Sequence, residues 1–364
     1  MLCYRLPYSV KCFSSRYRQR SFPVTGRRKP SAPFAGGIAG QADGLVERCV
    51  NRGDVSNDNS ALSSLPVSAA VGGIVGIQET SAGIHHCENS GKISNYYGNN
   101  LASFADKLYV VTGGIAGQAA IVNSCVNEKS AEVLGAVLSG SNPTTRNTHL
   151  LQVGGIVGYH LKGTVKECKN AGTVRSEATA NSFCGGIAGF DKGGAIALCA
   201  NRGTVNSTGR GGGIAGRTMS SSVDQCYHSG AVTAASYGGG LVAHAEGGSY
   251  TNNFSAGSHT GNYNAGLIGT IAGSVTLKGC YSAPKSITAL TAVIRAGSAA
   301  AKENNYFVKA AKESDATGAA TEVTAEQLSN AEAPLAGFGN TEIWIFDAEN
   351  GYAFPQLVNN PYEG

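Results

Sequence analysis

Gly36-Gly37-Ile38-Ala39-Gly40 is the first of six copies of one phrase, in which only the fourth residue alternates between Ala and Val. The other copies lie at 72–76, 113–117, 154–158, 185–189 and 212–216, and two altered copies follow at 239–243 and 265–269. Self-similarity at intervals of a few tens of residues is the signature of a fold that stacks one small unit on the next. The unit therefore has to be interpreted before any single residue.

A second phrase, Cys-x-Asn-x-Gly-x-Val, follows most copies of the first, as in Cys168-Lys-Asn170-Ala-Gly172-Thr-Val174. The glycine density and the lack of a 3.6-residue period exclude helical repeats, and each unit is typical of short strands. We expect the Ile and Val positions to form the interior and the cysteines to act as small apolar side chains. We expect the asparagines to form a hydrogen-bonded ladder at a turn, in which Asn and Gly supply the left-handed bend. In the seventh unit Phe254 is interpreted as standing in the cysteine's place.

The predicted fold is all-β: a right-handed parallel β-solenoid of about eight coils with a C-terminal cap. Three regions are expected. Residues 1–35 form a basic, disordered leader, residues 36–283 the solenoid repeats, and residues 284–364 the capping region. An aromatic cluster around Trp344 and Tyr352 is expected to cover the open end of the stack, because open sheet edges need protection. A carbohydrate-stacking site is the alternative for this cluster.

The charge distribution excludes one class of partner. Residues 1–34 hold eight Lys or Arg and no acid, which leaves 20 bases against 24 acids in the rest of the chain. A mildly acidic repeat body lacks the basic stripe that a phosphate backbone requires, so we expect no nucleic-acid binding. No segment has the length and apolar character of a membrane span, and no secretory signal is recognisable. The abrupt start of the repeats favours a piece of a longer protein with other domains.

No catalytic, cofactor or metal site is expected. The sequence Gly211–Gly216 satisfies the dinucleotide pattern G-x-G-x-x-G, but no βαβ unit surrounds it and it is the sixth phrase with one extra glycine. His85-His86-Cys87-Glu88 is the one local group of potential metal ligands. Adjacent strand residues face opposite sides, so at most two of these side chains reach one ion. The acidic residues recur at no repeat position, whereas a glycan-cleaving site needs paired carboxylates.

Function is expected where the spacing between units is longest, at 56–71, 94–112 and 134–153. Insertions at one repeat position emerge on one side of a solenoid, and this is often the binding side. Tyr rings supply stiff contact area and amides supply directional hydrogen bonds, which suits a glycan or protein ligand. The alternative is that these loops are neutral insertions. The candidate ligand contacts are Tyr96, Tyr97, Asn99, Asn100, Tyr109, Arg146, Asn147 and His149.

The paired phrases resemble the GLUG motif family over residues 36 to about 283. The segment from Thr324-Ala-Glu-Gln-Leu328 through Trp344 to Leu357 is similar to the closing segment of such proteins. The resemblance implies a secreted or surface-anchored bacterial protein that acts as an adhesin-like stalk or as a surface binding host glycan or protein. The alternative that it implies is an accessory region of a secreted peptidase or glycan-active enzyme whose catalytic domain lies outside this chain.

Overall fold

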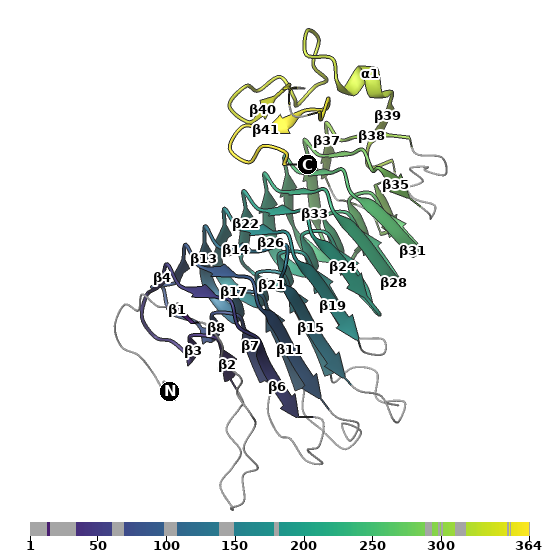
Figure 1. Cartoon of the computed structure of the whole chain (residues 1–364). Coiled ribbons are helices and arrows are strands. Elements are labelled where there is room, and N and C mark those ends of the chain that lie inside the picture. The colour runs from purple at the N-terminus through teal and green to yellow at the C-terminus, as the bar shows by residue number, and fades with distance from the viewer. Residues whose placement is uncertain are drawn as a thin grey trace, which may run out of the picture.

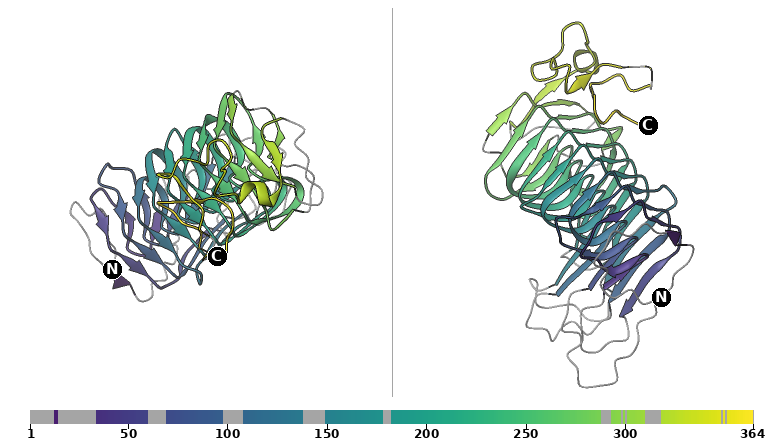
Figure 2. Two further views of the ribbon diagram at one scale, coloured as in Figure 1. Left: turned by 90° about the horizontal axis from the view of Figure 1, so that it is seen from above. Right: turned by 90° about the vertical axis from the view of Figure 1, so that its left-hand side faces the viewer.

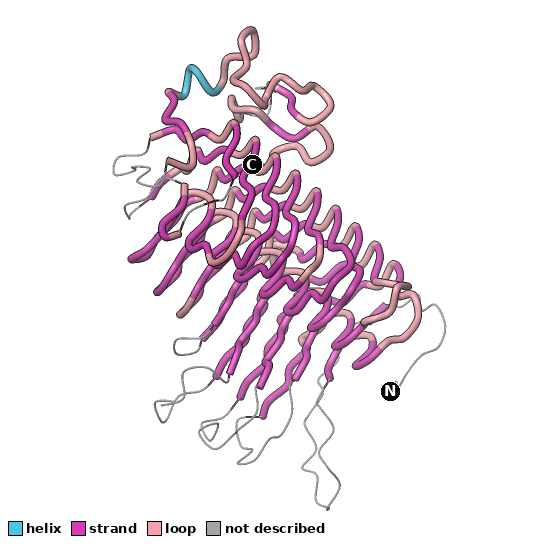
Figure 3. Tube along the Cα trace, turned by 180° about the vertical axis from the view of Figure 1, so that it is seen from behind, coloured by secondary structure: helices cyan, strands magenta, loops and turns pink. Residues whose placement is uncertain are grey.

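The fold is described from a computed structural model of the chain. The described residues are 13–14, 34–59, 69–97, 108–137, 149–177, 182–287, 293–297, 299, 301–309, 318–347, 349 and 351–363. The structure is all-β with long sheets of parallel strands, consistent with a β-helix or solenoid as the sequence predicts. Figure 1 shows the strands stacked in rows along a rod, which Figures 2 and 3 show from other sides.

Each unit of the repeat passes through three parallel sheets, which we call the narrow sheet, the body sheet and the wing sheet. The narrow sheet consists of β1 (Phe13–Ser14), β5 (Val50–Asn51), β10 (Glu88–Asn89), β14 (Val126–Asn127), β18 (Lys169–Asn170), β23 (Ala200–Asn201), β27 (Tyr227–His228), β30 (Phe254–Ser255), β34 (Tyr281–Ser282), β38 (Tyr306–Val308) and β39 (Thr321–Val323). Two residues of the predicted leader thus pair with β5, and the stacking continues past residue 283.

The body sheet follows the glycine phrase. Its main path is β3 (Ala39–Gln41), β8 (Val75–Gln78), β13 (Ala116–Asn123), β17 (Val157–Lys166), β21 (Ala188–Lys192), β26 (Ala215–Asp224), β29 (Val242–Thr251), β32 (Ile268–Ile271) and β36 (Ile294–Ala296). Shorter strands pair beside it: β4 (Val46–Glu47), β9 (Ile84–His85), β22 (Ala195–Ala197), β33 (Val275–Lys278) and β37 (Ala301–Glu303).

The wing sheet is folded into two layers. Its outgoing strands are β6 (Val55–Asn59), β11 (Lys92–Tyr97), β15 (Glu132–Val137), β19 (Thr173–Glu177) and β24 (Thr204–Ser207). Its returning strands are β2 (Phe34–Gly36), β7 (Ala69–Gly72), β12 (Leu108–Gly113), β16 (His149–Gly154), β20 (Ser182–Gly185) and β25 (Arg210–Gly212). The first residues of β28 (Ala231–Gly239) pair with β24 and its last residues pair with β25, so β28 joins the two layers. The next strand of the sheet, β31 (Ser258–Ala265), pairs with β28 on one side and with β35 (Ser286–Ile287) on the other.

Apolar side chains fill two separate interiors. The main core holds the Ile of the phrase, such as Ile115 and Ile156, together with the cysteines, as the sequence predicts. The cysteines of the repeat are all buried: Cys49, Cys87, Cys125, Cys168, Cys199, Cys226 and Cys280. A second core lies between the two layers of the wing sheet, where Val133 and Val174 of outgoing strands pack with Val153 of a returning strand. The wing sheet therefore has an apolar core of its own, separate from the main core.

The asparagines form the predicted ladder. Five fully buried asparagines make it: Asn51, Asn89, Asn127, Asn170 and Asn201. The Nδ2 of each of the first four donates a hydrogen bond to Oδ1 of the next asparagine. The Nδ2 of Asn201 faces the ring of His228. The donor–acceptor distances between successive asparagines are 2.7–2.8 Å. Buried amides that satisfy one another in this way fix the register of neighbouring coils.

The left-handed turn lies elsewhere than predicted. The residue just before the cysteine position has a positive φ in successive units of the described chain: Arg48, His86, Ser124, Glu167, Leu198, Gln225, Asn252, Gly279 and Asn304. The chain does bend at Asn-x-Gly between the narrow sheet and the wing sheet, where the asparagine side chain bonds the glycine backbone, but the prediction that these residues are left-handed is wrong. A single residue in the left-handed region reverses the side on which the next side chain points, which turns each cysteine inward.

The place assigned to Phe254 is also wrong. The register pairs Phe254 with Tyr227 and Tyr281, one position after the cysteine, and Asn253 occupies the cysteine's position. The three rings stack on the outer side of the narrow sheet at centroid distances of 4.9 and 5.0 Å. The C-terminal region packs on this row of rings through Phe338, Trp344, Tyr352, Leu357 and Tyr362.

The C-terminal region therefore lies along the flank of the narrow sheet. It contains α1 (Ala325–Leu328), begun by a capping box at Thr324, and the antiparallel pair β40 (Trp344–Ile345) and β41 (Gln356–Leu357). Asn360 donates to the carbonyl oxygens of Cys199 and Gln225, and Glu363 pairs with Lys169 at 2.5 Å. These contacts reach several coils back from the last strands, so the aromatic cluster covers a side face of the stack.

Candidate functional site

The three long insertions leave the stack at one edge, as the spacing of the phrases predicts. They connect the outgoing to the returning layer of the wing sheet, between β6 and β7, β11 and β12, and β15 and β16, which are neighbours within each layer. Most residues of the insertions lie outside the described part of the chain, and only their strand-forming ends are described. This edge and the outer face of the outgoing layer form the region to test for binding.

The structure places some of the predicted contact residues. Tyr96 is half-buried on the outer side of β11 and lies opposite Ala136 of β15. Three others occupy strands at the same edge, but their side chains are outside the description: Tyr97 in β11, Tyr109 in β12 and His149 in β16. Asn99, Asn100, Arg146 and Asn147 lie outside the described residues.

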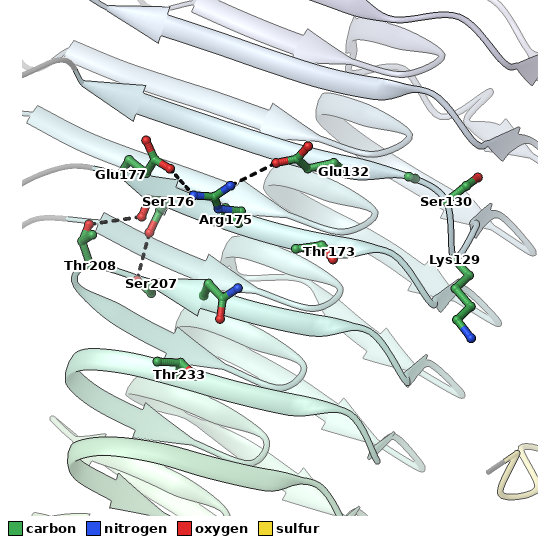
Figure 4. A pocket seen from close by; sticks show the side chains of 12 residues that line it. Lys129, Ser130, Glu132, Thr173, Arg175, Ser176, Glu177, Ser207, Thr208 and Thr233 are labelled. Atoms are coloured by element: carbon green, nitrogen blue, oxygen red, sulfur yellow. Dashed lines mark hydrogen bonds and ion pairs between the residues drawn. The ribbon is translucent and has the colours of Figure 1, made fainter.

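A shallow depression of about 780 Å³ lies on the outer face of the outgoing layer, next to this edge. Figure 4 shows its side chains coming from β15, β19, β24 and β28. The lining is polar, with Glu132, Thr173, Arg175 and Thr233 facing outward along neighbouring strands in Figure 4, and Asn206 paired in register with Arg175. Parallel register brings Arg175, Asn206 and Thr233 into one row, one strand spacing apart.

Ion pairs hold the charged side of the depression in place. The Glu132 carboxylate lies 2.9 Å from the Lys92 ammonium and 3.3 Å from the Arg175 guanidinium, whose other end reaches Glu177 at 2.5 Å. The hydrogen bond from Lys92 lowers the pKa of the Glu132 carboxyl. These groups are partly exposed, so the network contributes little to stability. It instead orients Arg175, whose donors suit hydroxyl and carboxylate oxygens of a ligand.

Sequence reasoning missed this depression because its residues do not recur. The row equivalent to Arg175 reads Ser94, Leu134, Arg175, Asn206 and Thr233 through the coils. The repeat fixes the inward positions and leaves the outward ones free to vary. Alignment of the units by the Val after Asn-x-Gly would have grouped these outward residues, but it gives no signal that separates a binding row from an ordinary surface.

The buried polar groups are structural. His160 Nδ1 lies 2.7 Å from Asp191 Oδ1 and its Nε2 lies 3.0 Å from the Ala120 carbonyl oxygen, with both side chains fully buried. Both ring nitrogens are thus engaged, and no substrate can reach them. Burial raises the pKa of the Cys184 and Cys199 thiols, and that of Cys280 to about 12. Hydrogen bonds with Cys125 and Cys49 lower the pKa of Cys87 to about 4, but all of these thiols are buried, so no substrate reaches them.

The remaining sequence candidates are placed as follows. Cys87 points into the main core, whereas His86 is exposed at the left-handed turn, so the His85–Glu88 group is divided between opposite sides. In the described part of the chain, no three His, Cys, Asp or Glu side chains gather in a way that could hold a metal ion. Trp344 is only 2% exposed, which leaves no free ring face for the alternative carbohydrate-stacking role.

Two buried histidines predict sensitivity to acid. His228 and His259 are fully buried, and burial lowers the pKa of His228 to about 3 and that of His259 to about 4. Below pH 6.5 the unfolded chain takes up protons at these rings and the folded chain does not, so stability falls as the pH falls. Between pH 6.5 and 4.5 the two rings together cost about 5 kcal/mol of unfolding free energy.

Urea denaturation at a series of pH values checks this expectation. The variant His228→Asn restores the asparagine of the other units and should remove about half of the loss between pH 6.5 and 4.5. A pH dependence that is identical in this variant and the wild type would show that other groups are responsible.

No helix among the described residues has the length and apolar character needed to cross a membrane. Comparisons of the chain with protein-family models, curated proteins and solved structures found no match.

Proposed function

We propose that the chain is a non-enzymatic bacterial repeat module, secreted or displayed at the cell surface, which works as an adhesin-like stalk and binds a host glycan or protein. The finer architecture belongs to the same proposal: a right-handed solenoid of about eight coils, related to the GLUG motif proteins. The observation that carries the proposal is the polar depression on the wing sheet, next to the edge from which the long insertions leave.

The chemistry of the depression suits hydroxyl-rich ligands. Arg175, Asn206 and Thr233 present donors and acceptors in a row along the stack, and the Glu132 carboxylate is held by two cations. A rigid two-layer wing loses little conformational entropy when a ligand binds, so a few polar contacts are enough for useful affinity. The stack can serve as a stalk because every coil adds one strand spacing to its length.

A glycan array tests the proposal. The purified chain should bind a subset of glycans, and Arg175→Ala and Asn206→Ala should each weaken that binding about tenfold, since each removes charged or amide donors. Lys166→Ala is the matched control, because Lys166 is exposed on the body sheet and pairs only with the adjacent Glu167. Deletion of residues 98–107 tests the insertion edge separately.

Two results would contradict the proposal. One is glycan and protein binding that is unchanged in all wing variants. The other is absence of binding by the isolated chain, which is what the alternative of an accessory region in a longer peptidase or glycan-active enzyme predicts.

A further inference from the structure

A second surface lies where the returning layer of the wing sheet meets the body sheet. Phe183 of β20 lies 6.3 Å from the His244 ring of β29, and the Arg217 guanidinium of β26 lies 5.4 Å from the Phe183 ring. The two sheets therefore face each other at this corner, with aromatic rings and arginines between them. This surface is separate from the depression in Figure 4, which is on the outgoing layer.

One end of the corner is closed and internally satisfied. Phe183 and Phe190 are buried, and Arg217 lies 4.6 Å from the Phe190 ring centroid. The Arg217 guanidinium also pairs with the Glu246 carboxylate at 2.7 Å, and His244 Nε2 lies 2.9 Å from the same carboxylate. Every charge at this end has a partner, so this end needs no ligand.

The other end of the corner carries two arginines and two tyrosines that we call the corner row: Arg210, Tyr237, Tyr263 and Arg295. Arg210 lies 5.3 Å from the Phe183 ring, which connects the row to the closed end, and 5.9 Å from the Tyr237 ring. The Tyr237 and Tyr263 rings stack at 5.4 Å, and Arg295 lies 5.2 Å from the Tyr263 ring. Arg210, Tyr237 and Tyr263 occupy one register position in successive coils. Tyr263 is 45% exposed, an unusual exposure for a ring in this chain.

The positive charges of the corner row have only distant compensation in the described part of the chain, where Glu246 acts on Arg210 without forming a salt bridge. Within the described residues, neither Arg210 nor Arg295 forms an ion pair with a carboxylate, in contrast to Arg217 and Arg175. Arg210 Nε is buried without a hydrogen-bond partner, and burial lowers the pKa of this guanidinium. A half-buried cation with an unused donor is costly unless an acceptor reaches it. The row is therefore complementary to an anion.

We propose that the corner row binds a linear acidic polysaccharide, with anionic groups at Arg210 and Arg295 and sugar rings on Tyr237 and Tyr263. An extended chain of pyranoses repeats at close to the strand spacing of ~4.8 Å, so successive sugars match successive coils. Tyrosine rings offer flat apolar faces to sugars, and guanidinium groups bind carboxylates through paired hydrogen bonds. The two arginines are three strand spacings apart along the stack, roughly 14 Å.

The charge pattern favours a glycan over a nucleic acid. Outside residues 1–34 the chain has fewer bases than acids, and the corner row presents two separated cations. A nucleic acid carries a phosphate at every nucleotide and needs a denser basic surface. A polyuronate carries one carboxylate on each sugar, and its pyranose rings offer apolar faces that can stack on the two tyrosines lying between the separated cations.

The test is titration calorimetry with a polygalacturonate oligosaccharide, compared with a neutral galactan oligosaccharide and with oligothymidylate. We expect binding of the polygalacturonate, at least about tenfold weaker binding of the neutral oligosaccharide, and affinity that falls with added salt. Arg210→Gln and Tyr263→Ser should each weaken binding about tenfold or more. Tyr263 is exposed, so its variant keeps the core, and unchanged far-UV circular dichroism confirms that both variants are folded.

Lys278→Gln is the matched control, because Lys278 is an exposed base of the body sheet that already pairs with Glu303. Arg175→Ala must leave polygalacturonate binding intact, which separates this proposal from that for the wing depression. The proposal is overturned by no binding, by equal affinity for neutral and acidic oligosaccharides, by tighter binding of oligothymidylate, or by full affinity in both corner-row variants.

Discussion

Gly213→Ala is expected to destabilise the protein by about 4 kcal/mol or more, although it adds a single methyl group. A Cβ at this position would lie 2.1 Å from the Gly240 carbonyl oxygen of the next coil and 2.4 Å from Cγ of His228. The first contact is with backbone, which cannot move without breaking the hydrogen bonds between coils. The loss should be seen as a lower urea midpoint and a lower melting temperature.

The control lies two residues away, at Gly211 in β25. A Cβ at Gly211 would meet Ala234, Ser207 and Val232 at an ordinary contact distance of 3.4 Å. Gly211 points between the two wing layers, where the previous coil has Cys184, so Gly211→Ala should cost less than about 1 kcal/mol. If the two variants lost equal stability, flexibility of the glycines and not close packing would explain the phrase.

This contrast shows why the sequence predicts the architecture well. The second glycine of each phrase lies against the asparagine of the same coil, as Gly155 does against Asn170 and Gly114 against Asn127. The two phrases recur together because the second glycine of the first phrase contacts the asparagine of the second phrase. The extra glycine that completes the dinucleotide pattern is Gly211, which makes no such contact. The repeated residues therefore determine how the interior of each unit is packed.

The errors arise where the repeat does not constrain the residue type. The residue before the cysteine position is left-handed in successive units of the described chain, yet it is Arg, His, Ser, Glu, Leu, Gln, Asn or Gly, so no composition signal marks the turn. Phe254 was misplaced for a related reason. Asn253 replaces the cysteine and its Oδ1 accepts a hydrogen bond from the Cys226 backbone nitrogen, which keeps the register with a different side chain.

The candidate sites were only partly predictable. The spacing of the phrases located the edge of the wing from which the insertions leave, because insertions at one repeat position share one side of a stack. The depression and the corner row depend on outward residues of neighbouring coils. Arg210 and Tyr263 are far apart in sequence, and only the register shows that they share one row.

Asn170→Ala is the second substitution with a large expected effect. It removes the hydrogen bond from Asn127 and the one to Asn201, both 2.7 Å long, so the buried Nδ2 of Asn127 loses its ladder partner and Oδ1 of Asn201 keeps only the Gly203 N–H. The Asn170 side chain also bonds both the N–H and the carbonyl of Gly172, which holds the turn. At about 1–3 kcal/mol for each unsatisfied buried group, the expected loss is about 3–5 kcal/mol.

Two comparisons separate the ladder from an ordinary loss of contacts. Asn51 makes one ladder bond among the described residues, so Asn51→Ala should cost about half as much as Asn170→Ala. Asn206 is partly exposed on the wing, and Asn206→Ala should change stability by less than about 0.5 kcal/mol. Hydrogen exchange adds a local readout, because loss of an inner rung should speed exchange in the adjacent coils first. Equal losses at Asn51 and Asn170 would mean that the number of ladder bonds does not set the loss of stability.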